Sequence, residues 1–292
     1  MAGLRGPNAV DGVILGGVAY DPKVVTIWEG FRSWFASQGL AFDYVLYSNY
    51  ERQVEDLMAG HLDMAWNSPL AWVRARRLGP VEAIAMRDSD CDLTSVVVVR
   101  TDSGIRSVDD LAGKRVGVGA VDSPQATLIP LWHLASRGVQ ATQAGSGAPA
   151  VEVVHHNIGM GMHGDHIGGE RDAAQALMRG EVDAACMIDG NHLAFSADGT
   201  LAAGATRVIA QTPAYDHCNM TVREMTPELA QFRDLLLSMS YSDPDVRPLL
   251  DLEGLKEWRD GRTSGYGPLD AAVTEQRFYG ADGSVTAVGY RP

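Results

Sequence analysis

Apolar and polar positions follow two alternating patterns along the chain. Short apolar runs such as Gly12 to Tyr20 and Phe42 to Tyr47 predict strands. The segment between them carries apolar residues at helical spacing from Val24 to Gly39, which predicts an amphipathic helix. Strands that alternate with such helices are typical of a parallel sheet covered by helices, so the pattern predicts an α/β fold.

The alternation continues over most of the chain. It predicts one strand and helix unit that is complete by residue 66 and a second unit of the same style that starts near residue 107. Other strands are expected at 62–66, 81–86, 93–99, 115–120, 151–154, 182–188 and 208–212, and other helices at 50–59, 170–178 and 227–239. The segment 141–150, which is rich in Gly, Ala and Ser, is typical of a surface loop.

Charge and length narrow the class of protein. The chain has 292 residues and a formal net charge of -13, with an isoelectric point near 5.0. This acidic balance argues against nucleic acid or an anionic membrane as partner, because both need a basic face. No stretch is apolar over the length needed to cross a membrane, so no insertion is expected. Because the protein as a whole is negatively charged, any anion that it binds must be held by the local arrangement of donor groups.

The cysteines and the first residues bear on the compartment. Cys91, Cys186 and Cys218 are odd in number and widely spaced, which does not fit a disulfide framework. The first eleven residues lack the apolar stretch of a secretory signal, which predicts a cytoplasmic protein. The prediction changes to the periplasm if a signal peptide has been removed.

The junction at residues 121–130 is the most informative stretch. It follows the predicted strand at 115–120 and opens a helix, with Ser123 suited to the N-cap and Pro124 to the first helical position. Backbone N–H groups at such a helix start point at whatever lies at the end of the strand, and the helix dipole favours a negative charge there. We therefore predict an anion cradle for a phosphate, phosphonate, sulfonate or carboxylate, although an ordinary capped helix start has the same pattern.

A second unusual stretch runs from Met160 to Glu170. His163, Asp165, His166 and Glu170 lie within this glycine-rich loop, and glycine lets the backbone approach a ligand closely. Imidazole together with carboxylate suits zinc or iron, so His163, His166 and Glu170 are candidate metal ligands. The alternative is that these groups form hydrogen bonds with loops or with a ligand, without a metal.

The order of several phrases resembles a known family. These phrases are Asp109-Asp-Leu-Ala-Gly-Lys-Arg-Val-Gly-Val-Gly, then Asp122-Ser-Pro-Gln-Ala-Thr at a helix start, then Asp172-Ala-Ala-Gln-Ala-Leu-Met-Arg-Gly-Glu-Val-Asp. Together they resemble type 2 periplasmic binding proteins of the phosphate- and phosphonate-binding branch, over residues 12 to 250. The turn at Ser123 has fewer hydroxyl groups than is usual in phosphonate binders, which leaves carboxylate and sulfonate as alternative ligands.

The resemblance implies a two-lobed α/β fold with a central ligand cleft and two crossing hinge strands. Lobe 1 would comprise residues 1–99, lobe 2 residues 100–206, and residues 207–292 would return to lobe 1 and add C-terminal helices, with hinges near 97–102 and 204–212. The residues that the resemblance places in the cleft are Tyr20, Asp21, Asn67, Ser68, Ser123, Gln125 and Thr127. Tyr215 and His217, which follow the second expected hinge, are further candidates for ligand contact.

Two functions remain open from the sequence. The first is a solute-binding protein that captures a small anion or zwitterion between its lobes and, if exported, serves the permease of an ABC transporter. In this role Tyr20, Asp21 or Asp165 would contact a cationic end of the solute. The second is a cytosolic enzyme on the same fold, in which His163, Asp165 and His166 act as acid, base or metal ligands. Fold alone does not choose between them.

Overall fold

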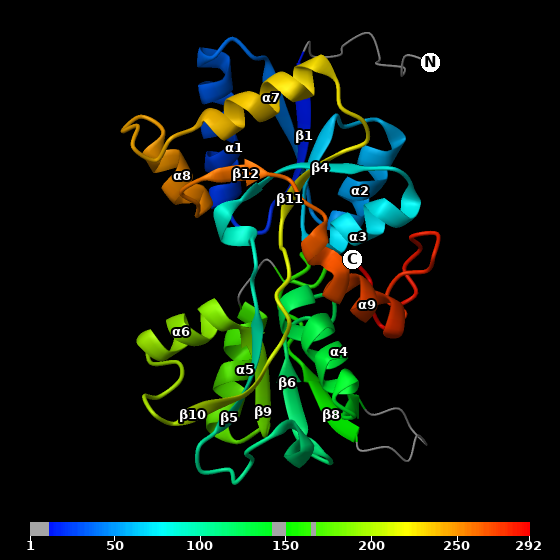
Figure 1. Ribbon diagram of the computed structural model, residues 1–292, viewed down its shortest axis with the longest axis vertical. Coiled ribbons are helices and arrows are strands. Elements are labelled where there is room, and N and C mark those ends of the chain that lie inside the picture. The colour runs from blue at the N-terminus through cyan, green and yellow to red at the C-terminus, as the bar shows by residue number, and fades with distance from the viewer. Residues whose placement is uncertain (1–11, 142–149, 165–167) are drawn as a thin grey trace.

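The protein consists of two lobes stacked along its longest axis, as seen in the computed structural model (Figure 1). The structure describes residues 12–141, 150–164 and 168–292. Each lobe is built on a six-stranded sheet with helices packed on it. The α/β fold and the two-lobed architecture are therefore confirmed. Both sheets contain antiparallel as well as parallel pairs, so they are mixed rather than purely parallel.

Lobe 1 contains the sheet with strand order β12-β4-β11-β3-β1-β2. Its strands are β1 (Val13–Val18), β2 (Phe42–Tyr47), β3 (Met64–Asn67), β4 (Glu82–Arg87), β11 (Asn219–Val222) and β12 (Trp258–Asp260). Its helices are α1 (Lys23–Ser37), α2 (Tyr50–Ala59), α3 (Pro69–Leu78), α7 (Pro227–Ser238) and α8 (Arg247–Glu253). The predicted spacing of α1 is confirmed, because Val24, Ile27, Trp28, Phe31 and Phe35 are buried and join one core with apolar side chains of α7.

Lobe 2 contains the sheet with strand order β10-β5-β9-β6-β8-β7. Its strands are β5 (Ser95–Arg100), β6 (Arg115–Val118), β7 (Gln140–Ala141), β8 (Ala150–His155), β9 (Ala184–Ile188) and β10 (Thr206–Gln211). Its helices are α4 (Ile129–Ser136), α5 (Gly168–Arg179) and α6 (Asp189–Ala197). Most of the predicted surface loop lies outside the described residues.

Two segments cross between the lobes, at residues 88–94 and 212–218. The first leaves β4 for β5 and the second leaves β10 for β11. An antiparallel bridge joins them at Leu93 and Tyr215. The expected hinges at 97–102 and 204–212 fall mostly inside β5 and β10, which pair with each other in the sheet of lobe 2. The crossings are therefore displaced from the expected positions, because the apolar runs there are sheet strands and not connections.

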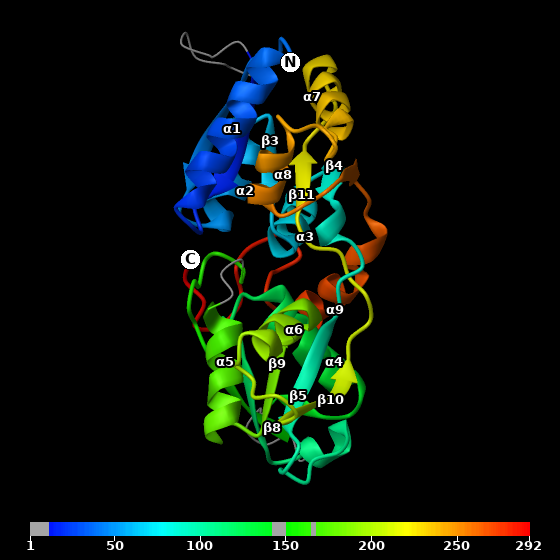
Figure 2. The ribbon, with the colours of Figure 1, turned by 90° about the vertical axis from the view of Figure 1, so that its left-hand side faces the viewer.

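The last part of the chain packs against both lobes. Helix α9 (Gly267–Glu275) lies at the junction of the lobes in both views (Figures 1 and 2). Leu269 and Phe278 share a buried core with Trp72 of α3 and Ile129 of α4. Arg77 of α3 adds hydrogen bonds to the segment that contains α9. This segment therefore holds the lobes together on one flank.

The loop at 161–164 makes a second contact between the lobes. The ring of His163 stacks on Tyr50 of lobe 1 with 4.8 Å between ring centroids. Its Nδ1 lies 2.6 Å from the Ser68 hydroxyl and its Nε2 lies 3.0 Å from Oε1 of Glu51. His163 has a φ of +50°, a left-handed conformation that the flanking Gly161 and Gly164 also adopt. The glycine-rich sequence thus serves to turn this imidazole into lobe 1.

We predict that Leu269→Ala lowers the free energy of unfolding by about 2–5 kcal/mol, because Leu269 is fully buried in the core that joins the lobes. The matched control is Leu193→Ala, where the side chain is 68% exposed and the expected change is within about 0.5 kcal/mol. Urea unfolding measures both values. Equal changes in the two variants would contradict the role of this core.

The contact between Glu51 and His163 predicts a loss of stability in acid. Burial raises the pKa of Glu51, but the His163 ring and the Tyr279 hydroxyl overcome this and lower the pKa from 4.5 to about 2. A depressed pKa stabilises the fold above pH 4.5, and this contribution is lost as the pH falls from 4.5 towards 2. Glu51→Gln should therefore flatten the acid limb of a plot of unfolding free energy against pH.

The control for this prediction is Glu29→Gln, because Glu29 is exposed and pairs with Arg32 only at the surface. Urea unfolding at several values between about pH 3 and about pH 7 covers the range in which an acidic side chain titrates. An acid limb that is as steep in Glu51→Gln as in the parent protein would show that this carboxylate does not stabilise the fold.

Candidate functional site

A cavity of about 290 Å³ opens between the lobes beside the crossing segments. Lobe 1, lobe 2 and the two crossing segments all contribute residues to its wall. The lining residues are Tyr20, Lys23, Trp66, Arg87, Ser89, Asp90, Leu93, Gln125, Gly164, Glu170, Ile188, Asn191, His217 and Cys218. Its position matches the cleft expected from the resemblance, and its size is near the lower end of what small-molecule sites use.

The wall formed by lobe 1 carries a cation, Lys23, that has no ionic partner among the described residues. The ammonium nitrogen of Lys23 lies 6.0 Å from the centre of the Tyr20 ring, and Lys23 forms no ion pair with any residue in the described parts of the chain. Asp21 lies next to these residues, but its Oδ1 accepts a hydrogen bond from the backbone N–H of Lys23 at 2.8 Å. The Asp21 side chain is thus engaged at the start of α1, and Lys23 supplies the positive charge on this wall.

The crossing segments form the floor of the cavity around a buried ion pair. Arg87 donates to both carboxylate oxygens of Asp90 and to the backbone oxygen of Glu253. Its guanidinium carbon lies 5.1 Å from the centre of the Trp66 ring. Burial raises the pKa of Asp90, but Arg87 and a hydrogen bond from His217 overcome this and lower the pKa to about 2. Asp90 is therefore charged at neutral pH, and its charge is neutralised by Arg87.

His217 and Cys218 lie beside this ion pair. The backbone N–H of His217 donates to the backbone oxygen of Asp90 at 2.8 Å, which ties the two crossing segments together. Nδ1 of His217 lies 3.1 Å from Sγ of Cys218 and 3.4 Å from Oδ1 of Asp90. The same imidazole nitrogen therefore faces both the sulfur and the carboxylate. A relay for nucleophilic catalysis uses opposite nitrogens of the ring, so this arrangement does not fit one.

The wall formed by lobe 2 is polar and carries one buried acid. Glu170 is 3% exposed, and its Oε2 accepts hydrogen bonds from the backbone of Ile188 at 3.0 Å and from Asn191 at 2.8 Å. Burial raises the pKa of Glu170. Nε2 of Gln125 donates to the backbone oxygen of Gly164 at 2.8 Å, whereas its buried Oε1 meets no donor among the described residues. Carboxylate and amide oxygens thus face a solute from this side.

The structure gathers only part of the predicted site at this cavity. Tyr20, Gln125, Glu170 and His217 line it. The other candidate residues that the structure describes are absent from its wall, and most have partners within the protein: Asp21, Asn67, Ser68, Ser123, Thr127, His163 and Tyr215. A role for these seven in direct ligand contact therefore has no support from their positions.

The predicted anion cradle illustrates why these residues differ from expectation. Ser123 caps the helix as predicted, since its hydroxyl accepts a hydrogen bond from the N–H of Ala126 at 3.2 Å. The hydroxyl of Thr127 donates to the backbone oxygen of Ala120 at 2.8 Å. Both hydroxyls are thus used inside one π-helical turn, Pro124–Leu128, which leads into α4. Gln125 is the residue of this turn that lines the cavity.

Three further candidates are buried inside lobe 1 or between the lobes. Asn67 hydrogen-bonds with Gln53 and Thr221. Ser68 caps α3 and contacts His163. The hydroxyl of Tyr215 lies 2.7 Å from the hydroxyl of Ser95. These side chains hold the strands and crossings in place and are not part of the cavity wall.

The predicted metal ligands do not come together where they are described. Both ring nitrogens of His163 contact residues of lobe 1, whereas Glu170 accepts hydrogen bonds inside lobe 2. Asp165 and His166 lie outside the described residues, so the acid, base and metal roles assigned to them stay predictions. His163 is fully buried, so its described surroundings do not favour the enzyme function.

Sequence reasoning missed several residues of this wall. Arg87 and Asp90 directly follow the predicted strand at 81–86, and Asn191 follows the strand at 182–188. Their positions directly after predicted strands could have marked them as candidate site residues. Lys23 was not among the predicted site residues, although it opens the helix after the first strand.

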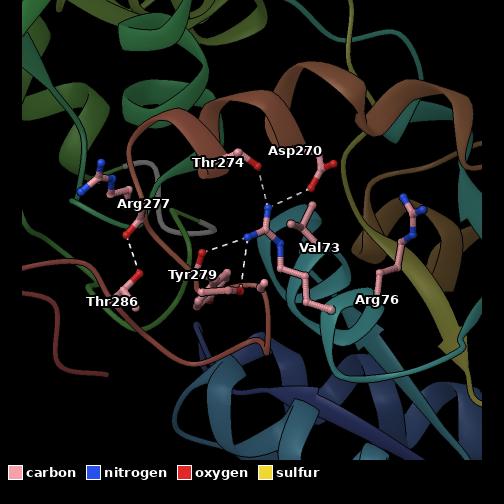
Figure 3. Close-up of a pocket in the computed structure, with 10 residues that line it drawn as sticks. Val73, Arg76, Asp270, Thr274, Arg277, Tyr279 and Thr286 are labelled. Atoms are coloured by element: carbon pink, nitrogen blue, oxygen red, sulfur yellow. Dashed lines mark hydrogen bonds and ion pairs between the residues drawn. The ribbon is translucent and has the colours of Figure 1, made fainter.

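Another cavity, of about 570 Å³, lies between α3 and α9 (Figure 3). Arg77 lines it, but the guanidinium group of Arg77 already binds Asp270, Thr274 and the backbone oxygen of Tyr279. This cavity is larger than the one at the crossings. We nevertheless place the functional site at the crossings, because that cavity joins both lobes and contains predicted site residues.

Comparison with known proteins identifies the family of the chain. A family model described as "ABC transporter, phosphonate, periplasmic substrate-binding protein" matches residues 19–266. The expected cytoplasmic location receives no support from this family, whose members are described as periplasmic. Within the described residues, no helix combines the length and the apolar character needed to span a bilayer.

Solved structures show the same fold at low sequence identity. PhnD1 of Prochlorococcus marinus MIT 9301, solved in complex with methylphosphonate, has a TM-score of 0.69 and 16% identity, with 93% of this chain and 100% of that chain covered. The periplasmic aliphatic sulphonate binding protein SsuA of Escherichia coli has a TM-score of 0.59 and 15% identity, with 97% and 96% covered.

A binding protein component of an ABC phosphonate transporter from Pseudomonas aeruginosa has a TM-score of 0.60 and 16% identity, with 91% of this chain and 87% of that chain covered. These likenesses concern the fold, whereas the match of the family model extends over most of the chain. The chain therefore belongs to the family of phosphonate periplasmic substrate-binding proteins of ABC transporters.

Proposed function

We propose that this protein captures a small phosphonate, or a related anion or zwitterion, in the cavity at the crossings and delivers it to the permease of an ABC transporter. The observation that carries the proposal is the Lys23 ammonium group, which lines the cavity without forming an ion pair among the described residues. Membership of the family supports the solute class and the permease as partner. The proposal also implies a periplasmic location.

The size and polarity of the cavity support a small, highly polar solute. A volume of about 290 Å³ leaves room for a compact molecule and little else. Lys23 offers hydrogen-bond donors to an anionic group, whereas the hydroxyl of Ser89 already donates to the backbone oxygen of Gly254 and Arg87 is neutralised by Asp90 and Glu253. The methylphosphonate complex of PhnD1 makes methylphosphonate the natural first probe.

The opposite wall supports a solute that also carries a positive charge. Glu170 accepts two hydrogen bonds, from Ile188 and Asn191, and the oxygen of Gln125 lies on the same side of the cavity. An ammonium group placed here would stabilise the charged form of Glu170, whose pKa is raised by burial. We therefore infer that an aminoalkylphosphonate fits the cavity better than a simple alkylphosphonate.

We predict that Lys23→Ala weakens the binding of methylphosphonate by about 10-fold or more, because a hydrogen bond to a charged group contributes about 1.5–3 kcal/mol. Isothermal titration calorimetry measures the change. The matched control is Lys256→Ala, since Lys256 is exposed and lies over the Tyr241 ring, outside the cavity wall. Unchanged affinity in Lys23→Ala, or an equal loss in the control, would show that Lys23 does not bind the solute.

Replacing Glu170 by Gln distinguishes the two kinds of solute. Glu170→Gln keeps the shape of the side chain but removes the negative charge, so 2-aminoethylphosphonate should lose about 10-fold or more in affinity. Methylphosphonate carries no ammonium group, and its affinity should hold or rise. Calorimetry with both compounds on the same variant provides the comparison, and equal losses for the two would refute the ammonium subsite.

A further inference from the structure

We propose that Asp90, His217 and Cys218 form a site for one divalent transition metal of the zinc type at the floor of the cavity. The three residues offer one oxygen, one nitrogen and one sulfur, a set of ligands that suits zinc and cobalt. Among the described residues, no other group of three or more His, Cys, Asp or Glu side chains has this arrangement.

The distances fit a shared metal ion. The three candidate ligand atoms all lie within 4.8 Å of one another. Nδ1 of His217 is 3.1 Å from Sγ of Cys218 and 3.4 Å from Oδ1 of Asp90. Bonds of about 2.0–2.3 Å in a tetrahedral site place neighbouring ligand atoms roughly 3.5 Å apart, so small side-chain movements suffice.

The charges around the cluster also fit a divalent cation. Arg87 bridges Asp90 and Glu253, so one positive charge lies between two negative charges. A metal ion displaces the proton of a cysteine ligand, which would add a third negative charge at Cys218. The group then carries two net negative charges, which a divalent cation neutralises. Arg87 therefore does not exclude the metal, although it contacts the same carboxylate.

The surrounding contacts hold the carboxylate of Asp90 and the backbone of His217 in place before any metal binds. Arg87 fixes both oxygens of Asp90, and the hydroxyl of Tyr266 donates to the backbone oxygen of His217 at 2.9 Å. Partners of this kind orient metal ligands and strengthen binding. Asp90 and Cys218 are each 2% or less exposed, whereas His217 is 9% exposed, and all three line the cavity.

Among the described residues, the cluster supplies three ligands, and the adjoining cavity leaves room for a fourth. Three protein ligands with an open fourth position are typical of sites at which a metal binds water or a small molecule. An anionic solute in the cavity would lie next to that position. The metal site does not depend on the proposed solute, because its ligands and their geometry belong to the protein alone.

A titration with Co²⁺ tests the proposal. Untagged protein is dialysed against a chelator and then titrated with Co²⁺ in the absence of any solute. Coordination by Cys218 should produce a sulfur-to-cobalt charge-transfer band that saturates at one equivalent and disappears when Zn²⁺ is added. Absence of this band in the parent protein would overturn the proposal.

Three variants assign the band to this cluster. Cys218→Ser should abolish it, and Cys91→Ser, in the same crossing region but outside the cluster, should leave it unchanged. His217→Ala should weaken binding of Zn²⁺ by about 100-fold or more. Changing a residue that only hydrogen-bonds to a metal ligand already costs about 10- to 100-fold, and this variant removes a ligand itself. Circular dichroism confirms that each variant is folded.

These variants also identify a metal bound elsewhere. A band that persists in Cys218→Ser, or that disappears in Cys91→Ser, would place the metal at another cysteine and overturn the proposal. Calorimetry with methylphosphonate on the metal-free parent protein reports solute binding separately. A failure of the metal proposal would therefore not count against the proposed solute-binding function, which is tested separately by that calorimetry.

Discussion

The ion pair between Arg87 and Asp90 is the interaction on which the arrangement of this site depends. It lies where the chain leaves β4 for lobe 2, and the backbone oxygen of Asp90 accepts a hydrogen bond from His217 of the other crossing. Asp90 therefore links lobe 1 to both connections between the lobes, through its carboxylate to Arg87 and through its backbone oxygen to His217. Removing Arg87 would leave the buried carboxylates of Asp90 and Glu253 without their cation, which is strongly destabilising. The floor of the cavity is thus held together by buried polar contacts between lobe 1 and the two crossings.

The two lobes are joined by more than their crossings. The aromatic core beneath α9 holds one flank, and the contacts of His163 with Glu51 and Ser68 add a second attachment. If the lobes move apart to admit a solute, the weaker of these two contacts should break first. Because the α9 core is apolar and large while the His163 contact involves a few polar atoms, we expect movement between the lobes to pivot about the α9 flank.

The sequence predicted most of the secondary structure, because the apolar periods are strong and local. The strands β1 and β2 and the helices α1 and α2 lie close to their expected bounds, and Gly60 ends α2 in the left-handed conformation. The expected hinges were displaced because an apolar run such as β5 does not reveal which sheet it joins. That choice depends on pairing with β9 and β10, which lie far away along the chain. The strands and helices near the end of the chain were not predicted individually. Helix α9, for example, packs against distant parts of both lobes, and no local pattern reports such contacts.

The same limit applies to the site. Ser123 was predicted as a helix cap and is one, but a cap that satisfies its own helix is not available to a solute. Asp90, His217 and Cys218 come together only because two distant crossings run side by side, and no local pattern in the sequence reports this. Lys23 was visible in the sequence, yet only the structure shows that it has no ionic partner among the described residues.

The most direct test of the central claim is a crystal structure of the protein grown with methylphosphonate. The account predicts that the phosphonate lies in the cavity at the crossings, with an oxygen within hydrogen-bond distance of the Lys23 ammonium group. A phosphonate bound instead at the helix start of residues 122–127, away from Lys23, or in the cavity between α3 and α9, would contradict it.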